Sequence, residues 1–149
     1  MGGSKLVSIL VLFLITLSTP LHATRMYVTG LVVCERVTRA DGRYSFFNIK
    51  DRLYFKKSDF PAVADFETAV SIVSEIRRKV LFKAAIMDSS GKVISVLPNK
   101  IISLDEYPKF FLISWRGVKF PSPGKYLIKI YLNNKLHYIY PLWVVTLKK

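Results

Sequence analysis

The stretch that decides the fold is residues 26–51, MYVTGLVVCERVTRADGRYSFFNIKD. Two runs rich in β-branched and aromatic residues flank a short polar segment, Ala40-Asp41-Gly42-Arg43. Such runs are typical of β-strands, and Asp-Gly supplies the positive φ angles that a short hairpin loop requires. The stretch therefore predicts a β-hairpin. Its apolar positions are Val28, Leu31, Val32, Val33, Cys34 and Val37 in the first strand and Tyr44, Phe46, Phe47 and Ile49 in the second.

The rest of the chain continues as apolar segments separated by short turns. The segment 52–61 predicts a loop or an edge strand, and Pro141 predicts a bulge or an edge position. Lys109–Phe120 is rich enough in apolar residues to predict burial on much of both faces. The other expected strands are Val80–Asp88, Lys125–Leu132 and Leu136–Leu147. A further strand is expected at Val93–Leu97, to break at Pro98 and to resume at Ile101–Leu104.

One segment, residues 65–76, fits both a strand and a helix by periodicity. Its β-branched residues favour a strand, in which Phe66, Val70, Ile72 and Ile76 would share one face. The whole chain has 149 residues, the size of one domain. About eight strands with short connections, and no helix after the N-terminal leader, predict an all-β fold and a single β-sandwich. An eight-stranded closed barrel is the alternative.

Residues 1–23, MGGSKLVSILVLFLITLSTPLHA, have the three parts of a secretory signal peptide. Lys5 supplies the positive start, an apolar run follows, and a polar end with Pro20 leads to Ala23. The run is shorter than the roughly 20 residues that cross a bilayer. We therefore expect export to the periplasm or medium, with the β-sandwich as residues 24–149. The alternatives are an uncleaved anchor, or a cytoplasmic protein whose translation starts at Met26.

Several blocks resemble a family of small, uncharacterised bacterial proteins. They are VVCERVTRADGRYSFFNIKD at 32–51, Phe60-Pro61, MDSSGKVI at 87–94 and VKFPSPGKYLIKIYLNNK at 118–135. The resemblance implies an immunoglobulin-like β-sandwich and carries no known activity, so it assigns no functional residue. Members of that family usually begin near the position of Met26, and the leader is a departure from the pattern.

The charge of the chain favours an acidic partner. With 23 basic and 10 acidic residues the formal charge is +13, and Lys5 is the only charged residue of the leader, so +12 remains without it. Such an excess suits anionic lipid, polysaccharide, acidic protein or, as a less favoured partner, nucleic acid. The same excess of positive charge would also keep the protein soluble. The single cysteine, Cys34, excludes an intrachain disulfide and lies among valines, where we expect a buried thiol.

The sequence predicts no enzyme, no cofactor and no metal site. His22 belongs to the leader, and His137 lies in the expected last strand. The pair Asp105-Glu106 is expected in a solvated turn, and no nucleophile elbow, phosphate loop or zinc motif is present. An enzyme of unrecognised type would need a pocket that brings His137 together with acidic residues.

Basic and aromatic residues interleave at 52–57, 115–120 and 129–135, a pattern that an anionic-polymer groove would use. The structural interpretation of the same pattern is aromatic side chains inside and cations outside. We expect a non-catalytic binding or scaffold protein of the cell envelope, with a nucleic-acid-binding cytosolic protein as the alternative and a homodimer through edge strands as a possible assembly. The expected basic surface comprises the turn Arg77, Arg78 and Lys79 together with Lys56, Lys57, Arg116 and Lys119.

Overall fold

The computed structural model describes residues 25–148, which form ten β-strands and one short 3₁₀ helix. The structure has two more strands than the sequence predicts. The segment 52–61 contains a strand of its own, and the strand expected to be interrupted at Pro98 is two separate strands. The leader and its predicted cleavage site lie outside the described residues. The elements are β1 (Met26–Ala40), β2 (Arg43–Ile49), β3 (Arg52–Phe55), η1 (Lys57–Asp59), β4 (Ala62–Ser74), β5 (Arg78–Asp88), β6 (Val93–Val96), β7 (Lys100–Leu104), β8 (Lys109–Phe120), β9 (Gly124–Leu132) and β10 (Lys135–Thr146).

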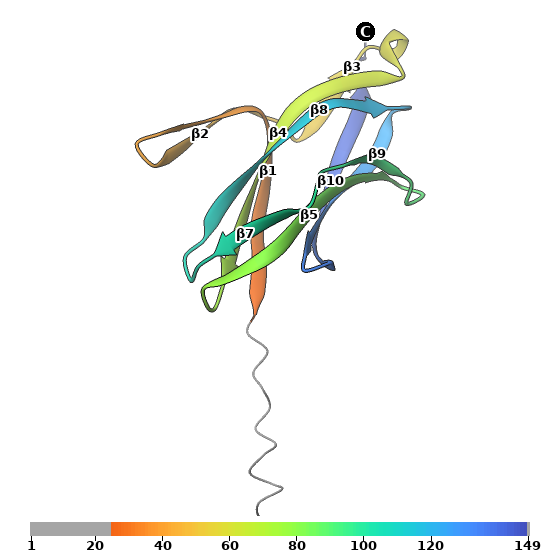
Figure 1. Cartoon of the computed structure of the whole chain (residues 1–149). Helices are drawn as coiled ribbons and strands as arrows, with labels where there is room; N and C mark the ends of the chain where they lie inside the picture. The colour runs from red at the N-terminus through yellow and green to blue at the C-terminus, as the bar shows by residue number, and fades with distance from the viewer. Residues whose placement is uncertain (1–24, 149) are drawn as a thin grey trace, which may run out of the picture.

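The strands form two facing sheets, which confirms the predicted β-sandwich (Figure 1). Sheet A has the order β2-β1-β4-β8, and sheet B the order β3-β10-β9-β5-β6, with β7 also paired to β5. Neighbouring strands are antiparallel except for β3, which runs parallel to β10. The two sheets do not join into one closed sheet, so the alternative of a closed barrel is wrong.

The ambiguous segment 65–76 is a strand, and β4 places its apolar residues in the core. Alternate residues from Phe66 to the end of β4 are fully buried, as the period-two pattern predicts. Ile76, expected on the same face, lies beyond the strand and is exposed. The buried hydroxyl of Thr68 is satisfied, because its Oγ1 accepts a hydrogen bond of 3.0 Å from the Trp115 indole Nε1.

In sheet B, too, alternate residues of the strands point into the core. One of them, Tyr126, also holds the corner between β8 and β9. The phenol of Tyr126 is buried, and its hydroxyl donates a 2.7 Å hydrogen bond to the carbonyl of Ser122. A tyrosine at the start of this strand that bonds back a few residues upstream is a tyrosine corner, a hallmark of immunoglobulin-like sandwiches. The core residues of sheet B include Val80, Phe82, Ala84, Ile86, Tyr126, Ile128, Ile130, Leu132, Leu142 and Val144.

The prediction that 109–120 is buried on both faces is wrong. Phe111, Ile113 and Trp115 point into the core, whereas Phe110 and Leu112 face outward and are exposed. The local density of apolar residues cannot tell which side of a strand a second sheet will cover.

The predicted hairpin is confirmed, but only part of it belongs to the sandwich. Asp41 and Gly42 have φ angles of 50° and 75°, as a two-residue loop of this kind requires. β1 pairs with β4 up to Cys34 and with β2 from there to its end. Residues 35–49, which we call the arm, therefore leave the body of the sandwich (Figure 1).

The arm is held against the outer side of sheet A by one carboxylate and by two aromatic contacts. Glu67 accepts hydrogen bonds from the Val37 main-chain N–H and from Ser114 Oγ, and its Oε1 lies 3.4 Å from Arg116 Nη2. The rings of Tyr44 and Phe46 meet Phe110 edge-on, with centroids 5.6 and 5.7 Å away. Cys34, where β1 passes into the arm, is buried as predicted and is not part of the core cluster between the sheets.

β10 contains both irregularities that affect sheet B. Its register with β9 shifts between Leu136 and Tyr138, so His137 occupies a bulge. Pro141 lies where β10 has β9 on one side only, because β3 covers just Trp143–Thr146. The prediction of an edge position for Pro141 is confirmed, and the missing N–H of proline costs no ladder hydrogen bond there.

Candidate anion-binding surface

The outward side of sheet B carries a mixture of cations and aromatic residues set by strand register. Trp143 of β10 lies opposite Arg52 of β3 on one side and Lys125 of β9 on the other. Residues directly opposite in neighbouring strands share a face, so these three form one row across the sheet. We call this side of sheet B the cationic face. Its cations are Arg52, Lys79, Lys83, Lys125 and Lys129, and its exposed apolar side chains are Tyr54, Val96, Ile101, Leu136, Ile139 and Trp143.

Acidic residues are absent from the outward positions of sheet B within the described part of the chain. Asp51 stands at the rim, where its Oδ2 lies 2.8 Å from Arg52 Nε. Most other carboxylates are held in turns or on sheet A by main-chain N–H groups or ion pairs. These include Asp59 on Lys56 N, Asp65 on Gly117 N, Glu67 on Val37 N, Glu75 on Arg25 N, Asp88 on Ser90 N and Lys92 N, and Asp105 beside Arg77 and Lys109. The charge of the domain is therefore segregated, with one purely cationic side.

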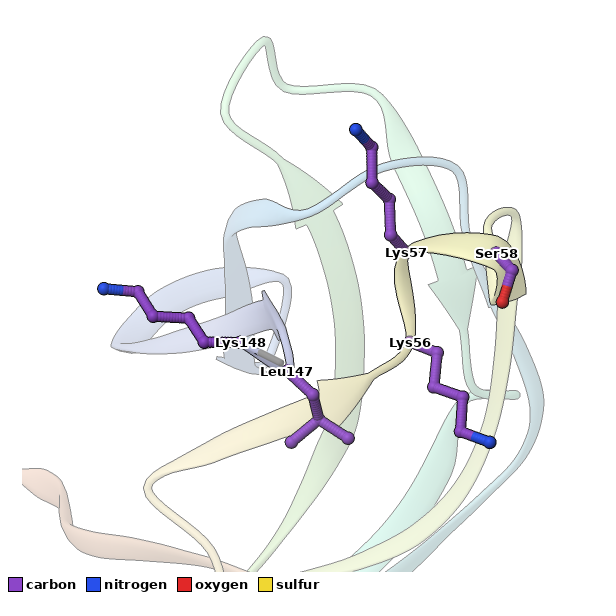
Figure 2. A pocket seen from close by; sticks show the side chains of 5 residues that line it. All are labelled: Lys56, Lys57, Ser58, Leu147 and Lys148. Carbon is purple, nitrogen blue, oxygen red and sulfur yellow. The ribbon is translucent and has the colours of Figure 1, made fainter.

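A hollow of about 830 Å³ adjoins the cationic face at the end of β3 and β10. The Leu147 N–H donates a 2.8 Å hydrogen bond to the Phe55 carbonyl, which holds the last described residues beside β3. Figure 2 shows Lys56, Lys57 and Lys148 extending in different directions around Leu147. Their ammonium groups do not converge on one point.

The structure distributes the seven basic residues singled out in the sequence over three places. Lys56 and Lys57 line the hollow, and Lys79 stands at the far end of the cationic face. Arg116 and Lys119 belong to β8 in sheet A, where Arg116 pairs with Glu67. They do not form one surface, and a binding role for each stays a prediction.

The expected basic turn is also different from the observed one. The connection between β4 and β5 consists of residues 75–77, and both Arg78 and Lys79 already belong to β5. Arg78 is half-buried, and the Nε of Arg77 lies 3.1 Å from Asp105 Oδ1. Only part of the predicted cluster is thus exposed, because the strand begins at Arg78, two residues earlier than the charge pattern indicates.

The residues that sequence reasoning missed are those of the Trp143 row. In 52–57 the interpretation of aromatics inside and cations outside is wrong for Tyr54, which is exposed on the same side as Arg52, and right for Phe55, which packs against the core. In 115–120 it is right, since Trp115 and Phe120 are buried while Lys119 is exposed. The alternation in 125–132 does place Lys125 and Lys129 on one outward side, as the structure confirms, but it does not indicate that Trp143 lies beside them.

The remaining titratable groups have structural surroundings. Burial lowers the pKa of His137 below its usual value, and nearby Lys135 adds to this effect. Burial likewise raises the pKa of the Cys34 thiol. Among the described residues, no three His, Cys, Asp or Glu side chains gather as a metal site would require. In residues 25–148 there is also no helix long and apolar enough to cross a membrane.

No protein family model matches this chain, and no curated protein matches it in sequence. Its structure resembles part of the alkylpurine DNA glycosylase AlkC of Pseudomonas fluorescens, solved bound to DNA containing an abasic site analog. That match has a TM-score of 0.52 and 12% identity, and it covers 80% of this chain and 30% of the glycosylase. The β-glucosidase EmGH1 of Erythrobacter marinus matches with a TM-score of 0.50 and 10% identity over 82% of this chain and 16% of the enzyme.

The CARDB domain of the PF1109 protein of Pyrococcus furiosus, solved with di-metal ions, is similar over nearly its whole length. The TM-score is 0.41 and the identity 16%, with 81% of this chain and 96% of that domain covered. This chain spans less than a third of the glycosylase and the glucosidase, and identities this low show the fold alone. The chain is thus an immunoglobulin-like β-sandwich, a domain type that also occurs as part of larger proteins.

Proposed function

We propose that this protein is a non-catalytic binding domain whose cationic face contacts an acidic partner. The observation that carries the proposal is the segregation of charge: five cations and no carboxylate occupy the outward positions of sheet B among the described residues. Like charges on one surface raise the local potential and attract anions from a distance of about a Debye length, 8–10 Å at ordinary salt.

Binding without catalysis is proposed because the groups that could move protons have other partners. Asp105 pairs with Lys109 and Arg77, and Glu67 holds the arm. His137 sits in a strand bulge near Met26, with no carboxylate among its electrostatic neighbours. Such groups hold the sandwich and its arm in place.

We further propose that the protein acts in the cell envelope, where the leader of residues 1–23 would deliver it. This part of the proposal rests on the sequence pattern of the leader alone. Sequencing the N-terminus of secreted or periplasmic material should give Thr24 as the first residue. A cytosolic product that starts at Met26 would contradict it.

The binding proposal is tested with dextran sulfate, using neutral dextran as the matched polymer. We expect binding to the sulfated polymer only, weakening at least tenfold when salt rises from about 50 to about 300 mM, since ion pairs at exposed sites are screened. The double variant Lys125→Gln/Lys129→Gln should bind more weakly than the unchanged protein. Equal binding to both polymers, or an affinity independent of salt, would contradict the proposal.

Nucleic acid is the second candidate partner, for a protein that begins at Met26. Exposed Trp143 and Tyr54 among cations favour it, because bases stack on aromatic side chains while phosphates meet lysine and arginine. A labelled single-stranded oligonucleotide should then bind at least as tightly as dextran sulfate of similar charge, and Trp143→Ala should release it. The absence of any mobility shift would remove this candidate.

A further inference from the structure

We infer that the acidic partner of the cationic face is the anionic surface of a lipid bilayer, on which sheet B lies flat. The inference rests on the proposed function and specifies its partner. It follows from the apolar side chains that lie among the cations, which the charge alone does not explain.

The cationic face exposes more apolar surface than a purely electrostatic site needs. Tyr54 is 53% exposed, and Trp143 and Ile139 are each 46% exposed. Contiguous exposed apolar patches on a soluble domain mark an interaction surface. A hydrophilic polyanion offers nothing apolar to cover Ile139, whereas the interfacial region of a bilayer offers phosphate groups and the upper acyl chains together.

The order of residues across the sheet matches such an interface. Trp143 has a cation on each side in its row, Arg52 and Lys125, and Ile139 lies opposite Lys129 in the next row but one. Tryptophan and tyrosine prefer the headgroup level of membranes. Long cationic side chains can rest their methylene stems on apolar neighbours while the charged ends reach the phosphates.

The hollow at the end of β3 and β10 combines exposed apolar and cationic side chains in the same way as the cationic face. Leu147 is exposed at its centre, and Lys56, Lys57 and Lys148 surround it (Figure 2). Because these ammonium groups point in different directions, they do not form a site for one small anion.

Sheet A provides the contrast within the same molecule. Its outward side carries Asp65 and Glu67, and the arm covers part of it. Arg39 and Arg43 are exposed in the arm, away from the cationic face. The double variant Arg39→Gln/Arg43→Gln therefore removes two positive charges, as Lys125→Gln/Lys129→Gln does, while leaving the cationic face intact.

The experiment is co-sedimentation of the full chain with vesicles of phosphatidylcholine, alone or with phosphatidylglycerol. The apolar leader is identical in all variants, so differences between variants report the sandwich. We expect binding to the anionic vesicles, weakened about 30-fold by Lys125→Gln/Lys129→Gln at about 1 kcal/mol for each cation near the surface. Arg39→Gln/Arg43→Gln should bind within about threefold of the unchanged protein.

Tryptophan fluorescence gives a second, local readout. The chain has two tryptophans, of which Trp115 is 1% and Trp143 46% exposed. Emission should shift to shorter wavelength and resist iodide quenching on anionic vesicles, and Trp143→Phe should abolish this change while near-UV circular dichroism shows a folded core.

Each outcome has a separate meaning. Binding to dextran sulfate without binding to anionic vesicles would overturn the bilayer inference and keep the proposed function, whereas binding to neither would overturn both. Equal weakening by the two double variants, or an unchanged Trp143 signal on bound vesicles, would also overturn the inference.

Discussion

The hydrogen bond between Trp115 Nε1 and Thr68 Oγ1 predicts a large effect from a small substitution. Both residues are at most 1% exposed, and the bond joins β4 to β8 in the centre of the core. Thr68→Val keeps the shape of the side chain and removes the acceptor, so the indole N–H is left without a partner in an apolar environment. An unsatisfied buried group costs about 1–3 kcal/mol, and we expect the free energy of unfolding to fall by about 2 kcal/mol.

The assay is urea denaturation followed by far-UV circular dichroism, with Thr29→Val as the matched control. Thr29 Oγ1 is also hydrogen-bonded, 2.7 Å from Ser71 Oγ, but it is exposed and water can replace the bond. The control should change the free energy of unfolding by less than about 0.5 kcal/mol. In the Thr68→Val/Trp115→Phe double variant both polar groups are gone, so the loss should be smaller than the sum of the two single losses by about 1 kcal/mol. A Thr68→Val protein as stable as the Thr29→Val control, or strictly additive losses, would refute the reasoning.

Three further substitutions test the corner, the arm and an ion pair. Tyr126→Phe removes the corner hydrogen bond and should lower the free energy of unfolding by about 1 kcal/mol, measured by the same denaturation. Glu67→Ala should leave the core intact but release the arm, so limited trypsin digestion should cleave within residues 35–49 much faster; an unchanged digestion rate would mean that the carboxylate does not hold the arm. The pKa of Asp105 is lowered chiefly by the hydrogen bond from Lys109 and further by Arg77, so its ionised form stabilises the fold above the ordinary aspartate pKa, and this stability is lost as the pH falls through the lower folded value. Asp105→Asn should therefore lose less stability than the unchanged protein between pH 7 and pH 3, and an identical pH profile would contradict the assignment.

Much of the fold follows from local patterns in the sequence. Asp-Gly predicts the hairpin turn, β-branched residues decide that 65–76 is a strand, and the alternation in 125–132 gives the inward side of β9. These signals are local because the φ preference of a turn and the period-two pattern of a strand depend on neighbouring residues alone. The short β3 was harder to predict, because four residues carry little periodic signal.

The cationic face depends on long-range pairing and therefore could not be read from the sequence. Trp143 lies opposite Arg52 only because β10 pairs in parallel with β3, a strand about ninety residues earlier in the chain. The bulge at His137 sets the phase of β10, and without knowing it Trp143 could equally be placed in the core. The burial of 109–120 on both faces was predicted wrongly for a related reason. The sequence does not show that the second sheet covers β8 on one side only, so that Phe110 and Leu112 stay exposed.

The division of β1 between two partners has a consequence for the dynamics of the domain. Its first half pairs only with β4, in the body of sheet A, and its second half pairs only with β2 in the arm. Exchange of the amides that are hydrogen-bonded to a neighbouring strand should thus differ sharply along one continuous strand, slow before Cys34 and fast after it, because the arm can open as a separate unit while the core stays closed. A single backbone segment then reports both local opening and global unfolding.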